Sequence, residues 1–109
     1  MKRRYGQTIG LINAENSEGT VRVIGGMKDI EKIKPHEIIV LRKMSPYTAP
    51  YIIKCNGIVV EEAALLQHAS ILAREFGIPC ISLKNAMKIL KNGDKVVLDS
   101  HRGEVIVID

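Results

Sequence analysis

Apolar and polar positions alternate in short blocks along the chain, and each block predicts one structural element. Some blocks alternate with a period of two, and others are uninterrupted apolar runs of four to eight residues bounded by turn residues. Strands are therefore predicted at residues 7–14, 20–25, 37–42, 56–62 and 80–83, and as a pair around "SHRG" within 95–109. The strands outnumber the helices that the same pattern predicts.

Helical segments are predicted where apolar residues recur every three or four positions. They lie at residues 27–33, 47–55, 65–76 and 85–93. The apolar face of the longest segment is formed by Leu65, Ala69, Leu72, Ala73 and Phe76. Gly77 and Pro79 are expected to end that helix, because glycine suits a helix C-terminus and proline cannot continue it. We expect one α/β domain over residues 1–109, with residues 1–5 as a flexible basic tail.

The composition is that of an ordinary soluble domain, with 46% hydrophobic and 26% charged residues in 109 positions. No apolar run approaches the roughly 20 residues of a membrane span, and the basic start lacks the apolar core of a signal peptide. The expected compartment is therefore the cytoplasm. The net charge of +4 permits an anionic partner, but 4% aromatic residues and no stacking motif make nucleic acid the weakest candidate.

The cysteines and two of the histidines suggest no metal site. Cys55 and Cys80 lie in apolar surroundings, where free thiols pack as small hydrophobic groups. His36 and His101 lie in polar turns, and their spacing from the cysteines matches no zinc motif. We therefore expect two buried, reduced thiols and no bound metal or cofactor.

His68 lies in the first turn of the predicted helix 65–76. There the helix dipole disfavours a protonated imidazole, and the backbone N–H groups of Ala69, Ser70 or Ile71 could bind an anion attached to the ring. A histidine that accepts a phosphoryl group needs both conditions. Most histidines near a helix start have no chemical role, however, and the spacing alone leaves that alternative open.

The segment around His68 adds a resemblance to a known family. "GIVVEEAALLQHASILAREFGIP", residues 57–79, resembles the phosphohistidine region of phosphoenolpyruvate-utilising enzymes, among them phosphoenolpyruvate synthase and pyruvate phosphate dikinase. An alignment without gaps places the family's phosphorylated histidine on His68. The other matching positions are Gly57, Glu61, Ala69, Ser70, Ile71, Ala73, Arg74, Ile78 and Pro79.

The resemblance implies a fold, a function and partners. The fold would be the swivelling β/β/α domain, with compact mixed sheets and a few short helices. His68 would carry a phosphoryl group, supported by Gln67, Ala69 and Ser70. The partners would be a separate nucleotide-binding protein, a protein that binds phosphoenolpyruvate or pyruvate, or both. We expect neither of them within these 109 residues, which contain no glycine-rich phosphate loop and are too few for a barrel of about 250 residues.

The chain departs from the family pattern in the loop before His68. Ala63 and Ala64 replace a pair of glycines, and Leu66 replaces a threonine that could cap the helix. Gln67 stands in place of a serine or cysteine, and Glu62 adds a second carboxylate beside Glu61. These changes favour either a carrier for a different donor or a non-catalytic interaction module that kept the fold.

Overall fold

The computed structural model describes residues 2–6, 16–42, 48–62, 71, 74–99 and 102–108. Within these residues, seven strands form one sheet in the order β1-β7-β6-β2-β3-β4-β5. The strands are β1 (Lys2–Gly6), β2 (Ser17–Ile24), β3 (Ile38–Leu41), β4 (Gly57–Val60), β5 (Cys80–Ser82), β6 (Lys95–Asp99) and β7 (Glu104–Ile108). The helices are α1 (Met27–Ile30), α2 (Ala49–Ile52) and α4 (Ala86–Ile89), and residues 71 and 74–76 are also helical.

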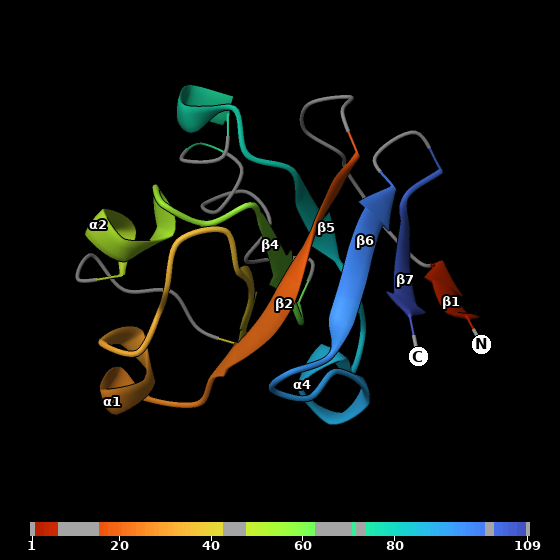
Figure 1. Cartoon of the computed structure of the whole chain (residues 1–109), viewed down its shortest axis with the longest axis horizontal. Helices are drawn as coiled ribbons and strands as arrows, with labels where there is room; N and C mark the ends of the chain where they lie inside the picture. The colour runs from red at the N-terminus through yellow and green to blue at the C-terminus, as the bar shows by residue number, and fades with distance from the viewer. Residues whose placement is uncertain are drawn as a thin grey trace.

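The sheet consists of a parallel half and an antiparallel half that share β2 (Figure 1). Residues 17–20 of β2 pair with β6 in the antiparallel sense, whereas residues 21–24 pair with β3 in the parallel sense. β4 and β5 continue the parallel half, and β7 and β1 continue the antiparallel half. One long strand thus joins two small sheets into a single surface.

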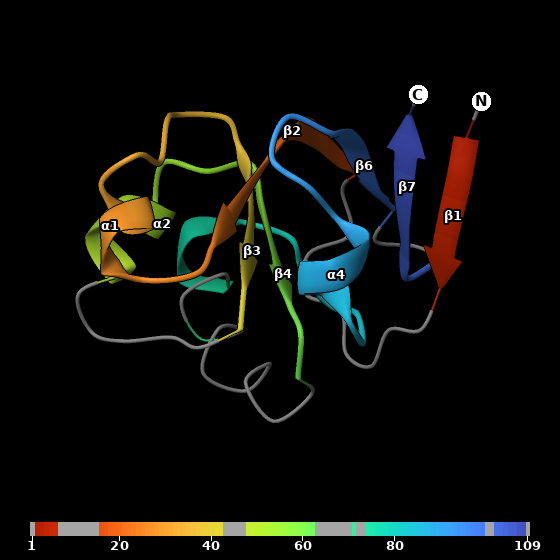
Figure 2. The ribbon, with the colours of Figure 1, turned by 90° about the horizontal axis from the view of Figure 1, so that it is seen from below.

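Helices lie on both faces of the parallel half, with α1 and α2 on one side of β3 and β4 and α4 on the other (Figure 2). A first core cluster lies on the α1 and α2 side and contains Ile24, Ile30, Ile39, Leu41, Ile52, Cys55, Ile58, Val60, Ile78 and Cys80. A second core cluster lies on the α4 side and contains Val21, Ile38, Val40, Val59, Ile81, Leu83, Ala86, Leu90, Val96, Leu98, Val105 and Val107. Successive residues of β3 alternate between the two clusters, as the two-residue period of a strand requires.

The observed elements confirm most of the predicted ones. Strands occur in four of the predicted ranges, with β2 starting three residues early, and on both sides of the "SHRG" turn where two were expected, and the mixed α/β class is confirmed. Of the four predicted helices, three contain α1, α2 and α4, each only four residues long. The strand predicted at residues 7–14 lies outside the described residues.

The basic residues near the N-terminus form strand β1, so the flexible tail predicted over residues 1–5 is contradicted for residues 2–5. β1 pairs with β7 in a continuous register from Lys2↔Ile108 to Gly6↔Glu104. Tyr5, opposite Val105 in this register, packs against the second core cluster. The pairing satisfies backbone groups that a tail would leave to water, while Arg3 and Arg4 remain exposed. Charged side chains on an edge strand also discourage pairing with other chains.

Candidate functional site

The predicted phosphoryl-carrying residue and its supporting residues belong to the stretch of sequence between β4 and β5. His68, Gln67, Ala69 and Ser70 all lie outside the described residues, so their roles stay predictions. So do the loop replacements Ala63, Ala64 and Leu66. The described residues on either side of this stretch, Glu61 and Glu62 before it and Ile71 and residues 74–76 after it, define where the chain leaves the sheet and returns to it.

The chain leaves the sheet at the carboxyl end of β4, among three parallel strand ends. Leu41, the last residue of β3, is in register with Val60, and Val60 is in register with Ser82 of β5. The connection from β4 to β5 therefore crosses between two neighbouring parallel strands. In open α/β sheets, ligands bind outside the carboxyl ends of the strands. The predicted site follows β4 at this edge in the sequence.

Glu61 connects two elements at this edge, because it contacts the end of β3 with the adjoining Arg42 and also helix α4. Its backbone N–H donates to the carbonyl oxygen of Leu41 at 2.9 Å, which continues the pairing of β3 with β4. Its carboxylate Oε2 accepts a hydrogen bond of 2.8 Å from the backbone N–H of Met87 in the first turn of α4. Its Oε1 lies 4.0 Å from Nε of Arg42. Glu61 thereby fixes the start of the segment that leads to His68.

The second carboxylate at this edge is exposed to solvent. Glu62 follows Glu61 immediately, and its side chain is exposed, whereas Glu61 is partly buried. A solvated carboxylate is screened by water and salt and repels an incoming anion weakly. The Glu61 carboxylate, in turn, is engaged with the Met87 N–H and lies near the Arg42 guanidinium.

The helical residues 74–76, at the end of the connection from β4 to β5, differ from the predicted packing in the exposure of one side chain. Gly77 has a φ of +68° and follows the helical residues 74–76, which confirms it as the helix stop. Phe76, however, was expected on the buried face, and 47% of its surface is exposed. Ile78, two residues later, is buried in the first core cluster and anchors this end of the connection instead. Arg74 and Glu75 are exposed, as expected for Glu75.

Cys55 and Cys80 are buried free thiols in the first core cluster, as predicted. Burial raises the pKa of Cys55 to about 12. Burial also raises the pKa of Cys80 to about 12, and the neighbouring Cys55 adds to that rise. Both thiols therefore stay protonated at neutral pH and are poor nucleophiles or metal ligands. No group of three or more candidate metal ligands occurs within the part of the chain that the structure describes.

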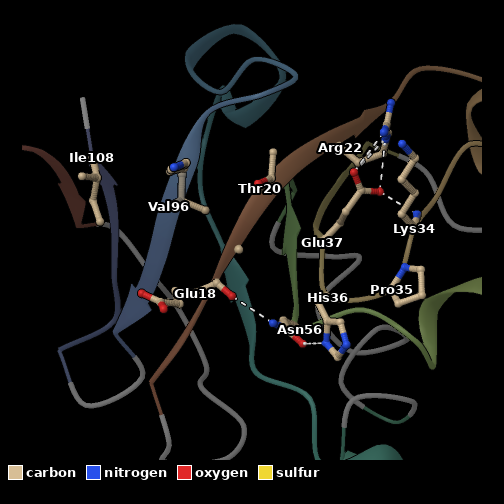
Figure 3. A pocket seen from close by; sticks show the side chains of 12 residues that line it. Glu18, Thr20, Arg22, Lys34, Pro35, His36, Glu37, Asn56, Val96 and Ile108 are labelled. Carbon is tan, nitrogen blue, oxygen red and sulfur yellow. Dashed lines mark hydrogen bonds and ion pairs between the residues drawn. The ribbon is translucent and has the colours of Figure 1, made fainter.

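A second polar region, which the sequence did not indicate, lies at the amino ends of β3 and β4 (Figure 3). Arg22 donates to the Glu37 carboxylate from Nε and, at 2.9 Å, from a terminal nitrogen. The same carboxylate accepts a 2.7 Å hydrogen bond from the backbone N–H of Lys34. The side chain of Glu37 is 9% exposed and that of Arg22 is 22% exposed, so this is a largely buried ion pair.

Asn56 organises the loop beside this ion pair. Its side-chain nitrogen donates to the carbonyl oxygen of Glu18 at 2.9 Å, which orients the amide. The amide oxygen then faces Nδ1 of His36 at 3.2 Å. Because an amide oxygen can only accept, this pairing puts the proton of the neutral imidazole on Nδ1. His36 itself has a φ of 70°, a conformation that few residues other than glycine adopt. These contacts join residues far apart in the sequence, so spacing could not reveal them.

No helix within the described residues is long and apolar enough to cross a membrane. The mixed sheet, with short helices on both faces and a crossover after β4, is the fold class of swivelling phosphotransfer domains. A family model described as "PEP-utilising enzyme, mobile domain" matches residues 33–103. The chain belongs to this family.

Relatives and solved structures agree with this assignment. Over 90 residues, covering 82% of the chain, it is 33% identical to a probable phosphoenolpyruvate synthase of Methanothermobacter thermautotrophicus. Over 88 residues, covering 80% of the chain, it is 39% identical to the phosphoenolpyruvate synthase of Pyrococcus furiosus. The chain spans 13% and 11% of these two proteins. A solution structure of Enzyme I superposes with a TM-score of 0.63 at 25% identity, over 72% of this chain and 33% of that one. In such enzymes the mobile domain works with separate domains.

Proposed function

We propose that this chain is a single cytoplasmic domain that carries a phosphoryl group on His68 between separate partner proteins. One partner would bind a nucleotide, and the other would bind phosphoenolpyruvate or pyruvate. The observation that supports the proposal is the resemblance of residues 57–79, without gaps, to the family's phosphohistidine region, in which His68 occupies the position of the phosphorylated histidine. The family match over residues 33–103 includes this whole segment.

The chemistry requires an imidazole nitrogen that is neutral and reachable. A ring nitrogen of His68 would attack the phosphorus in line, so that an N–P bond forms while the P–O bond of the donor breaks and the leaving oxygen keeps the electron pair. Transfer to the acceptor reverses these steps and restores the free imidazole. Gln67, Ala69 and Ser70 would supply hydrogen-bond donors to the phosphoryl oxygens. The anchoring of β4 by Glu61 would support this arrangement by fixing where the segment starts.

Intact-mass measurement at neutral pH, without acid, tests the proposal. The protein is incubated with ATP or phosphoenolpyruvate in an extract of the source cells, and we expect an increase of about 80 Da, the mass of one phosphoryl group. The increase should be lost in acid, persist in base and be absent in His68→Ala. His101→Ala is the matched control, because it removes another histidine and should retain the full increase. No increase with either donor, with His68 shown to be accessible to a histidine-modifying reagent, would contradict the carrier function.

A non-catalytic interaction module is the second candidate, favoured by Ala63, Ala64 and Leu66 in place of the family's loop residues. On that hypothesis the chain keeps the fold and its partner contacts but transfers nothing. The exposed Ile71 and Phe76 could then contribute to a contact surface. A pull-down from the same extract that compares the wild-type protein with His68→Ala distinguishes the two. Equal capture of a partner, together with no mass increase, would favour the module.

A further inference from the structure

A groove crosses the open face of the antiparallel half, away from the carboxyl ends of the parallel strands. Its volume is about 830 Å³, and its lining includes Thr20, Arg22, Lys34, His36, Lys95 and Ile108 (Figure 3). It lies at the amino ends of β3 and β4, where Asn56 and the loop before β3 meet β2. The edge that precedes His68 in the sequence is at the other end of these strands.

The floor of the groove is a row of cross-strand neighbours. Thr20 on β2 is in register with Lys95 on β6, and Lys95 is in register with Ile108 on β7. Residues directly opposite each other in antiparallel strands point to the same face, so the three side chains form one line. All three are exposed, including Ile108 with 37% of its surface. The floor thus offers a hydroxyl, an ammonium and an apolar side chain side by side.

The wall of the groove is formed by residues 34–37, and it is held rigidly against β2. The Asn56 backbone N–H donates to the Glu37 carbonyl at 2.9 Å, and the Ser17 hydroxyl donates to the Asn56 carbonyl at 2.6 Å. The Asn56 side chain bridges His36 and the Glu18 carbonyl, as described above. A preformed wall lowers the conformational entropy that a binding partner must offset.

The charges that face the groove are predominantly positive. Glu37 is neutralised by Arg22 and by the Lys34 N–H, so it does not act as an exposed acid. The ammonium groups of Lys34 and Lys95 have no ion-pair partner among the described residues, and both side chains are exposed. Glu18 is the remaining carboxylate in the lining. An occupant therefore gains most from carboxylates that reach the two lysines.

We propose that this groove binds an extended acidic segment of a partner polypeptide. Its carboxylates would pair with Lys34 and Lys95, and an apolar side chain would contact Ile108. Among the described residues that line the groove there is no Phe, Tyr or Trp, and the imidazole of His36 is the one aromatic ring, so at most one base could stack there, and this favours a polypeptide over a single-stranded nucleic acid. The inference goes beyond the carrier function and does not depend on it, because a module without phosphotransfer could use the same groove.

The groove and the edge that precedes His68 lie at opposite ends of β3 and β4, so a partner in the groove does not cover that edge. A partner segment held at the amino ends of β3 and β4 leaves the opposite edge, with Glu61 and Arg42, uncovered. The domain could thus remain attached to one partner while the segment that follows β4 faces another. Tethering of this kind raises the effective concentration of the second partner without any new contact at the reacting group.

Titration of the ¹⁵N-labelled full chain with an octaglutamate peptide tests the proposal. Amide shifts in two-dimensional NMR spectra report the place of binding, and their dependence on peptide concentration gives the affinity. We expect shifts at Thr20, His36, Lys95 and Ile108, and affinity that falls steeply as salt is added. The charge-reversed Lys34→Glu/Lys95→Glu protein should bind at least tenfold more weakly. Lys84→Glu/Lys88→Glu is the control with the same net charge. Its lysines are exposed, Lys84 just before α4 and Lys88 within it on the other face, and its affinity should stay within about threefold.

Four results would overturn the proposal: no binding of octaglutamate at low salt, shifts confined to residues outside the groove, equal weakening in both charge-reversed proteins, or tighter binding of a decathymidylate oligonucleotide in the groove than of the peptide. Equal weakening would mean that only the overall charge matters. If the spectrum of Lys34→Glu/Lys95→Glu lost its dispersion, Lys34→Gln/Lys95→Gln would replace it with the same expected direction. None of these measurements uses His68, so a negative result here and a failure of phosphotransfer are separate outcomes.

Discussion

The carboxylate of Glu61 accepts a hydrogen bond from the backbone N–H of Met87 at 2.8 Å, across 26 residues of sequence. Helix α4 begins after Asn85, whose own side chain makes no capping hydrogen bond. Glu61 therefore does from a distance what an N-cap residue usually does locally, because it satisfies an amide in the first turn. The same residue also begins the segment that leads to the predicted phosphohistidine.

Replacing Glu61 separates its hydrogen bond from its charge. Glu61→Ala leaves the Met87 amide without this acceptor and should lower the free energy of unfolding by about 1–2 kcal/mol. Glu61→Gln keeps an acceptor oxygen and should lose less than half of that, since the ion pair with Arg42 is 4.0 Å long and Arg42 is 66% exposed. Urea unfolding followed by circular dichroism measures both. Equal losses in the two variants would show that the charge, and not the hydrogen bond, is what matters.

A substitution at Gly19 tests how closely the groove wall approaches β2. A Cβ atom at this position would lie 2.5 Å from the carbonyl oxygen of His36 and 3.2 Å from Ile38. The first contact is with backbone, which cannot move aside cheaply, so Gly19→Ala should cost about 2 kcal/mol of unfolding free energy. Gly26→Ala is the matched control, because nothing lies within 4 Å of its Cβ position and its φ of −174° suits any residue. Its unfolding free energy should change by less than about 1 kcal/mol.

Breaking the Arg22–Glu37 ion pair should lower the free energy of unfolding far more than breaking the Arg42–Glu61 pair at the opposite edge. Arg22→Ala leaves the buried Glu37 carboxylate with only the Lys34 N–H as a partner, which should cost about 2–3 kcal/mol. Adding Glu37→Gln to this variant should recover part of the loss, because the uncompensated charge is removed. Arg42→Ala breaks an exposed pair and should cost less than about 0.5 kcal/mol. A double-mutant cycle in urea measures the coupling, and coupling near zero would contradict the buried-pair interpretation.

The sequence predicted the parallel half well because its strands are buried on both faces. β3 and β4 consist entirely of buried residues, so each appears as an apolar run bounded by turn residues. β1 was missed because its stability comes from pairing with β7, more than 90 residues away, and not from its own pattern. The short helices were predicted too long. Leu90 is already extended (φ −99°, ψ 137°) and packs into the second core cluster, so α4 ends well before Gly93.

The two candidate sites differ in the same way. One was predicted from a contiguous segment, and the other depends on contacts between residues far apart in the sequence. His68 was predicted from a contiguous segment in which many residues match a family pattern, so the prediction needed no knowledge of distant contacts. The groove depends on Asn56, whose hydrogen bonds reach Ser17, Glu18 and His36, between 20 and 39 residues earlier. "KPHEI" and "KCNG" contain nothing that indicates these contacts. Only the pairing of β2 with both β3 and β6 brings the residues together.

The two buried thiols should make stability depend on pH in the alkaline range. Their pKa values are raised from 9.0 to about 12 in the folded protein, so the unfolded chain releases these protons first as the pH increases. The stability contributed by the protonated thiols is complete below pH 9 and is lost between pH 9 and about 12, and at pH 10 the loss should be about 1.4 kcal/mol per thiol. Lysine and tyrosine side chains also titrate here, so the comparison is with Cys55→Ala/Cys80→Ala, which should be less stable at pH 7 because of the cavities but lose less between pH 8 and 10. Urea unfolding under reducing conditions at three pH values measures the difference, and parallel pH profiles for the two proteins would contradict protonated, buried thiols.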